Sequence, residues 1–238
     1  MPVSRRGRTT VALGGAGLAV ALACLGVGAI QLSSSASAAP RSVISPTPEH
    51  ARGRSRVVAR KRRPRYDIAF FGDSVSVGAG ASKRKSGYVA LVSRWLRTRG
   101  ARVVQTVHAK GGVPVGYWVN AAIPRKLDGA VVELGTNDVR LGTSSSQFAH
   151  EYRTLTSRIR AANPKVKLLC LSVWSHRGSP SPLDAGVNAL IRAICPGTYV
   201  DITRFRDRPG IRSSDGFHPN DAGYRLIALA IQSKLKTR

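Results

Sequence analysis

Three short motifs, far apart in this 238-residue chain, carry side chains that can act together on an ester. Gly72-Asp73-Ser74 offers a hydroxyl, Gly135-Thr136-Asn137-Asp138 offers an amide, and Asp215-Gly216-Phe217-His218 offers an imidazole three residues after a carboxylate. A serine hydroxyl becomes a strong nucleophile when a base takes its proton, and a carboxylate fixes the tautomer of a histidine base. Together the motifs predict a serine hydrolase.

Each residue has an expected role in acyl transfer. We expect Ser74 to be the nucleophile, His218 the base and Asp215 the partner of that base. Asn137 would donate its amide to the oxygen that becomes negative in the tetrahedral intermediate, together with backbone N–H groups of Ser74 and of a glycine. Gly-Asp-Ser alone often marks a turn and helix cap, so the prediction rests on the conjunction of the motifs.

Short apolar runs lead directly into the first two motifs, at 67–71 and 130–134. Runs of this length bounded by glycine indicate buried strands of a parallel sheet. In open α/β sheets, ligands bind beyond the carboxyl ends of the strands. Polar residues that follow two such ends are therefore candidates for one site.

The rest of the chain alternates strand and helix patterns. The expected strands are 67–71, 102–107, 129–134, 166–173 and 198–202, and the expected helices are 87–99, 144–162, 183–194 and 221–235. This alternation predicts a doubly wound, three-layer α/β/α sandwich with about five parallel strands.

Residues 1–39 have the pattern of an export signal. Three arginines before residue 9 precede a nearly uncharged run at 11–30, and Ala36-Ser37-Ala38 supplies the small residues of a cleavage site. The run is long for a cleaved signal, so an uncleaved N-terminal anchor is the alternative. Either interpretation predicts an extracytoplasmic protein, secreted or anchored to the cell membrane.

A linker and one domain follow this segment. Residues 40–65 are basic, rich in Pro, Ser and Arg, and poor in apolar residues, which predicts a disordered linker. Residues 66–238 number 173, a length that suits one hydrolase domain with its own core. Cys170 and Cys195 are predicted either to form a disulfide in an oxidising compartment or to remain buried free thiols.

The chain is strongly basic, with 38 Lys and Arg against 12 Asp and Glu. Such a charge attracts an anionic cell-wall polymer or an acidic membrane surface. The alternative is coding bias alone, because 29 of the basic residues are arginine. We expect no specific nucleic-acid partner, since no basic motif interleaved with aromatic residues is present. No Cys, His and carboxylate cluster has metal-ligand spacing, so no metal is expected.

The motifs, their order and the elements that carry them resemble the SGNH (GDSL-type) hydrolases over 66–238. The resemblance implies a flavodoxin-like fold and esterase, lipase or carbohydrate-deacetylase chemistry without a cofactor. It assigns the roles given above to Ser74, Asn137, Asp215 and His218. Two features depart from the family pattern: valine follows the serine where leucine is usual, and no asparagine precedes the glycine pair.

The family's glycine donor falls on Gly111 or Gly112, of which we favour Gly111. We expect the pocket walls to come from the loops at 76–86, 113–126 and 175–184.

The sequence thus predicts an exported, monomeric serine esterase that hydrolyses carbohydrate O-acetyl or lipid esters through an acyl-enzyme. One alternative is an O-acyltransferase acting on cell-envelope sugars. The other is a non-catalytic module that binds an anionic cell-wall polymer.

Overall fold

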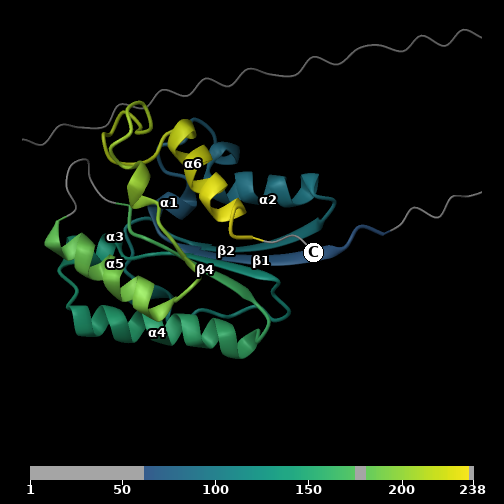
Figure 1. Cartoon of the computed structure of the whole chain (residues 1–238), viewed down its shortest axis with the longest axis horizontal. Helices are drawn as coiled ribbons and strands as arrows, with labels where there is room; N and C mark the ends of the chain where they lie inside the picture. Colours follow the sequence, from purple (N-terminus) through teal and green to yellow (C-terminus); the bar gives the residue numbers. More distant parts are fainter. Residues whose placement is uncertain (1–61, 175–180, 236–238) are drawn as a thin grey trace, which may run out of the picture. The chain divides into compact units, whose positions relative to one another are not determined.

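A five-stranded sheet forms the centre of the domain (Figure 1). The computed structural model describes residues 62–174 and 181–235, so the predicted signal and almost all of the predicted linker lie outside the described residues. All neighbouring strands are parallel, in the order β2-β1-β3-β4-β5. The strands are β1 (Arg65–Gly72), β2 (Arg102–Ala109), β3 (Gly129–Glu133), β4 (Lys167–Leu171) and β5 (Tyr199–Val200).

Helices cover both faces of this sheet, which confirms the predicted three-layer architecture (Figure 1). One face packs against α2 (Tyr88–Thr98) and α6 (Asp221–Gln232), and the other against α4 (Ser145–Ala162) and α5 (Pro182–Ile194). The shorter helices are α1 (Ser74–Val77) and α3 (Thr136–Leu141), with the 3-10 turns η1 (Arg84–Ser86), η2 (Val115–Trp118) and η3 (Thr203–Phe205).

Local sequence explains where the long helices begin. The Ser144 hydroxyl caps α4 by accepting the Gln147 N–H. Ser181 and Asp184 form a reciprocal capping box at the start of α5, with Pro182 at the first helical position. Both arrangements satisfy backbone donors that the first helical turn leaves free.

The main differences from the predicted elements lie at their ends and in the short helices. The strand predicted at 166–173 is limited to β4, the strand at 198–202 is limited to β5, and the last helix ends at Gln232. Helices α1 and α3 were not predicted, because four and six residues are too short to show apolar periodicity. Both follow the carboxyl ends of central strands, where the motifs lie.

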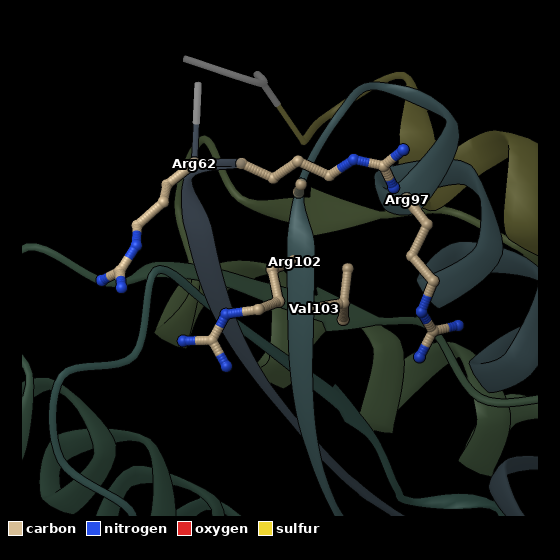
Figure 2. Close-up of a pocket in the computed structure, with 6 residues that line it drawn as sticks. Arg62, Arg97, Arg102 and Val103 are labelled. Carbon is tan, nitrogen blue, oxygen red and sulfur yellow. The ribbon is translucent and has the colours of Figure 1, made fainter. Parts of the chain in front are cut away.

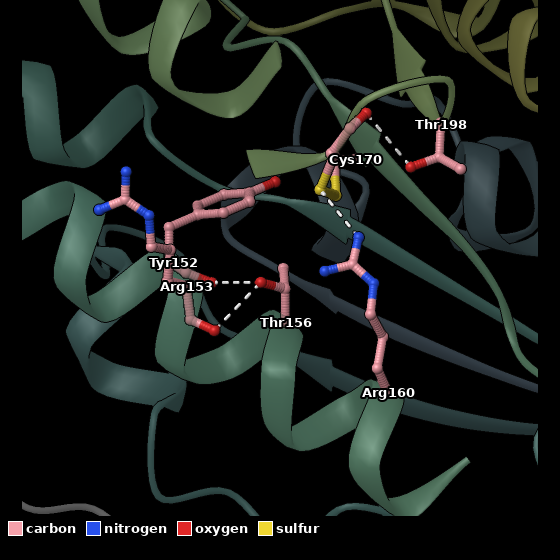
Figure 3. Close-up of a disulfide and its surroundings, with 7 residues drawn as sticks. Tyr152, Arg153, Thr156, Arg160, Cys170 and Thr198 are labelled. Atoms are coloured by element: carbon pink, nitrogen blue, oxygen red, sulfur yellow. Dashed lines mark hydrogen bonds between the residues drawn. A yellow bond between two sulfur atoms is a disulfide. The ribbon is translucent and has the colours of Figure 1, made fainter. Parts of the chain in front are cut away.

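A disulfide joins Cys170 in β4 to Cys195, the residue that follows α5 (Figure 3). The structure therefore selects the disulfide over the alternative of free thiols. Both cysteines are buried. The Arg160 guanidinium from α4 approaches the Cys195 sulfur at 3.8 Å. The covalent link closes a loop of chain that runs from β4 to the end of α5.

None of the helices in the described ranges is long and apolar enough to cross a membrane. The apolar run at 11–30, which carries the anchor prediction, lies outside these ranges.

Candidate active site

Ser74 lies immediately beyond the carboxyl end of β1, at the first position of α1. Asp73 caps this short helix by accepting the Val75 N–H at 3.0 Å. Gly72 has no space for a side chain, because an added Cβ would lie 1.8 Å from the Ser76 Oγ. The strand can turn into α1 at this point because residue 72 is glycine. This turn leaves Ser74 partly exposed at the edge of the sheet.

A compact turn brings His218 to Ser74 across 144 positions of sequence. Asp215 Oδ1 accepts the backbone N–H groups of Phe217 and His218, each at 2.9 Å, and the Ser213 hydroxyl at 2.6 Å. Its other oxygen lies 2.6 Å from His218 Nδ1. His218 Nε2 lies 2.9 Å from the Ser74 Oγ. One carboxylate therefore both shapes the turn and holds the imidazole.

These contacts determine where the protons lie. The hydrogen bonds from Ser213 and His218 lower the pKa of Asp215 well below its ordinary value, so its carboxylate is ionised at neutral pH. Nδ1 of His218 then carries the proton donated to Asp215, which leaves Nε2 to accept the Ser74 hydroxyl proton. This tautomer is the one that a general base needs.

Asn137 enters the same site from α3, beyond the carboxyl end of β3. Its side chain is almost fully buried, and its Nδ2 donates to Asp73 Oδ2 at 2.9 Å. An amide NH₂ has two protons, so one remains for another acceptor. On the opposite side, Asn137 Oδ1 accepts from Arg140 Nε at 3.4 Å. The amide is thus oriented from both ends.

The two candidate glycines occupy different places beside Ser74. A Cβ at Gly111 would lie 3.7 Å from the Ser74 Cβ, so Gly111 adjoins Ser74. Gly112 has a φ of +77° and lines the cavity in front of Ser74. Arg140 donates to the Gly112 carbonyl at 3.5 Å and so also contacts the glycine loop.

A cavity of about 580 Å³ opens in front of Ser74 and His218. Its apolar wall includes Val139, Trp174 and Phe217, and its charged groups are Arg140 and Asp184. The remaining described lining residues are Ser74, Gly112, Thr136, Asn137, Ser181 and His218. A cavity that combines an apolar wall with a few polar groups is typical of a site for a small ester or a sugar unit.

Comparison with known proteins decides the family. The GDSL-like Lipase/Acylhydrolase family matches residues 70–226, which include all three motifs. The chain is 30% identical over 182 residues to "GDSL lipase Rv0518" of Mycobacterium tuberculosis, covering 68% of this chain and 78% of that protein. The chain belongs to the GDSL-like lipase/acylhydrolase family. It is therefore a serine ester hydrolase, as the motifs predicted.

Solved structures show the same fold for this GDSL hydrolase. The structure of TesA has a TM-score of 0.62 and 20% identity, covering 71% of this chain and 98% of that one. A two-domain esterase active on acetylated mannans, crystallised with mannopentaose, has a TM-score of 0.59 and 22% identity, covering 72% of this chain and 49% of that one. The flavodoxin-like α/β fold expected from the resemblance is confirmed.

Near Ser74, the GDSL hydrolase buries a pair of acidic side chains, Asp73 and Glu133. Burial raises the pKa of Asp73 to about 6 and raises that of Glu133 well above its ordinary value. Glu133 Oε2 accepts from Ser76 at 2.9 Å, and Ser76 in turn contacts the Tyr88 hydroxyl at 2.6 Å. Glu133 Oε1 is buried without a hydrogen-bond partner in the described part of the chain.

Two adjacent buried carboxyl groups favour a state in which at least one is protonated. A proton on Glu133 would supply a hydrogen bond to Asp73, the residue that holds the Asn137 amide. The sequence contained a signal for this pair, because Glu133 is a lone acid within an otherwise apolar strand.

The residues that form most of the cavity wall, and the backbone group that Asp138 contacts, were not predicted from the sequence. The cavity wall comes mainly from α3, Trp174 and Phe217, and of the three loops expected to form it only 175–184 contributes described residues. Asp138 accepts the Val115 N–H and so fixes the loop ahead of η2. The described ranges contain no group of three or more His, Cys, Asp or Glu residues placed to hold a metal ion.

Proposed function

We propose that this GDSL hydrolase is an exported esterase in which Ser74, His218 and Asp215 form the catalytic triad. The observation that carries the proposal is the continuous chain of contacts from Ser74 Oγ to His218 Nε2 at 2.9 Å, and from His218 Nδ1 to Asp215 Oδ2 at 2.6 Å. These distances lie within the range that a nucleophile and its base require for proton transfer.

The reaction then has two halves. Ser74 Oγ attacks the ester carbonyl while His218 Nε2 takes its proton, and the same proton passes to the alcohol as the carbon–oxygen bond breaks. Water then attacks the acyl-enzyme, His218 takes a proton from the water, and the acid leaves as Ser74 recovers its proton. Asp215 stabilises the imidazolium in both halves.

We assign the developing oxyanion to three donors: the Ser74 N–H, the Gly111 N–H and the second proton of the Asn137 amide. The fixed orientation of that amide between Asp73 and Arg140 supports this role, because a donor that is already oriented needs no reorganisation during the reaction.

The proposed substrates are acyl esters carried by carbohydrate or by lipid. The cavity supports both, since Trp174 and Phe217 offer apolar surface and Arg140 and Asp184 offer polar contacts. The structural neighbour active on acetylated mannans and the curated relative named as a lipase represent these two substrate classes. Comparing acetylated mannan with long-chain glycerol esters as substrates of the purified protein distinguishes the two classes.

Export is the second part of the proposal. The disulfide between Cys170 and Cys195 supports it, because such bonds persist mainly in oxidising compartments outside the cytoplasm. Mass spectrometry of protein recovered from the extracytoplasmic fraction is expected to give a mature chain that begins near residue 39. A full-length chain in that fraction would instead support an uncleaved N-terminal membrane anchor.

Labelling of the serine tests the triad directly. A fluorophosphonate is expected to label the wild type at Ser74, and a nitrophenyl acetate assay is expected to show turnover. Ser74→Ala should lose both, while the matched variant Ser145→Ala, at an exposed serine on α4, should retain both. Normal turnover by Ser74→Ala would refute the assignment.

A further inference from the structure

A second cavity, of about 630 Å³, is lined by the residues drawn in Figure 2. It lies at the amino ends of β1 and β2, whereas Ser74 follows the carboxyl end of β1. Arg102 and Val103 contribute from the amino end of β2, and Arg97 from the last turn of α2. Arg62 and Arg63 contribute from the segment ahead of β1, which is tied to β2 by the hydrogen bond from the Arg102 N–H to the Pro64 carbonyl. Ala101 completes the described lining.

Four of these six lining residues are arginines, and none is acidic. Within 62–174 and 181–235, none of the four guanidinium groups makes an ion pair or a hydrogen bond. Like charges that share a concave surface repel one another, and a bound anion relieves that repulsion. The chain as a whole reinforces the effect with a formal net charge of +26.

The identity of the basic residues points to phosphate. A guanidinium presents a planar fork of donors that binds phosphate oxygens in pairs, whereas a lysine ammonium acts as a point charge. All four basic residues of the cavity are arginine, so each can bind phosphate in this way.

The arrangement of the arginines favours an extended ligand over a single ion. In Figure 2 the Arg97 and Arg102 side chains lie on opposite sides of Val103, and Arg62 extends away from Arg97. Guanidinium groups that are spread around a strand can contact successive charges of a polymer. A membrane surface is a poorer partner, because none of the large exposed apolar side chains in the described part of the chain lines this cavity.

We propose that this arginine cavity binds a linear polyanion that carries repeated phosphate groups. Binding there leaves the ester site accessible, because Ser74 follows the carboxyl end of β1 while the cavity lies at its amino end. Eight residues of strand separate the two by about 26 Å. The cavity thus holds the hydrolase on a phosphate-rich polymer while the active site remains open to ester groups.

Calorimetric titration of the purified protein with inorganic polyphosphate tests the proposal. Arg97→Gln/Arg102→Gln is expected to weaken binding by about 10-fold and to reduce the salt dependence of log Kd by about 1.4, or roughly 0.7 for each lost contact. The matched control is Arg153→Gln/Arg192→Gln, which removes the same charge from exposed positions on α4 and α5. The control should stay within about 2-fold of the wild type.

The remaining measurements separate this cavity from the active site and guard against misfolding. Ser74→Ala should bind polyphosphate as tightly as the wild type, and polyphosphate should not inhibit wild-type hydrolysis of a nitrophenyl ester. If thermal melting shows that Arg97→Gln/Arg102→Gln is unfolded, Arg62→Gln/Arg63→Gln replaces it, because these residues precede β1 and belong to no helix or strand.

Three results would overturn the proposal. These are an absence of polyphosphate binding, an equal loss of affinity in the matched control, and binding to phosphatidylglycerol vesicles alone. Each is independent of whether Ser74 hydrolyses esters, so the binding proposal and the triad assignment succeed or fail separately.

Discussion

Breaking the Cys170–Cys195 bond should destabilise the domain by an amount that follows from the length of chain it closes. The two cysteines are 25 positions apart. In the chain-entropy model, a cross-link over a loop of this length lowers the entropy of the unfolded chain enough to stabilise the folded state by about 3.5 kcal/mol. Breaking the bond removes this stabilisation, which for a domain of this size lowers Tm by roughly 7–14 °C.

The assay compares oxidised and reduced wild-type protein by urea unfolding and thermal melting. Reduction keeps both sulfur atoms in place, so it isolates the cross-link from the packing of two buried side chains. Cys170→Ala/Cys195→Ala should lose more free energy of unfolding than the reduced wild type does, because the double variant also leaves cavities in the core. Oxidised and reduced wild type with equal urea midpoints would refute the reasoning.

Three further predictions concern the polar residues around Ser74. Asn137→Ala should lower kcat by about 10²–10³-fold with little change in KM on a nitrophenyl ester, because it removes one of the three proposed oxyanion donors. Burial raises the pKa of Asp138 from 3.8 to about 6, so its contribution to stability is full below pH 3.8 and is lost as the pH rises through 6. The free energy of unfolding of Asp138→Asn, taken relative to that of the wild type, should therefore rise by up to about 3 kcal/mol between pH 4 and pH 8. Urea titrations that give the same difference at both pH values would contradict this. Glu133→Leu should lower kcat by about 10-fold more than Glu133→Gln, since only glutamine retains a donor for Asp73; equal kcat values would show that this donor is dispensable.

The sequence was most informative where short apolar runs end in polar motifs. The strands that precede Ser74 and Asn137 are buried along most of their length, and such strands produce continuous apolar runs that can be recognised without a structure. The predicted three layers and parallel strands follow from the alternation of these runs with helices. The proximity of Ser74 to His218 was predictable from the motifs in combination, although 144 positions separate the two residues.

The cavity wall could not be predicted in the same way. Val139 and Arg140 lie on a six-residue helix that is too short to show a periodic pattern. Trp174 and Phe217 meet only in the folded chain, where the Trp174 indole donates to the Phe217 carbonyl at 2.8 Å. Contacts of this kind depend on tertiary packing and leave no local signal in the sequence.

The two edges of the sheet differ in a way that bears on self-association. An open edge presents unpaired backbone groups to which a strand of another molecule can add. The edge at β5 is only two residues long and so provides little to pair with. The edge at β2 is eight residues long, but it begins at Arg102 beside the arginine cavity, whose charge repels the same edge of another copy. The features proposed to hold a phosphate polymer would therefore also protect the hydrolase from aggregation through its sheet.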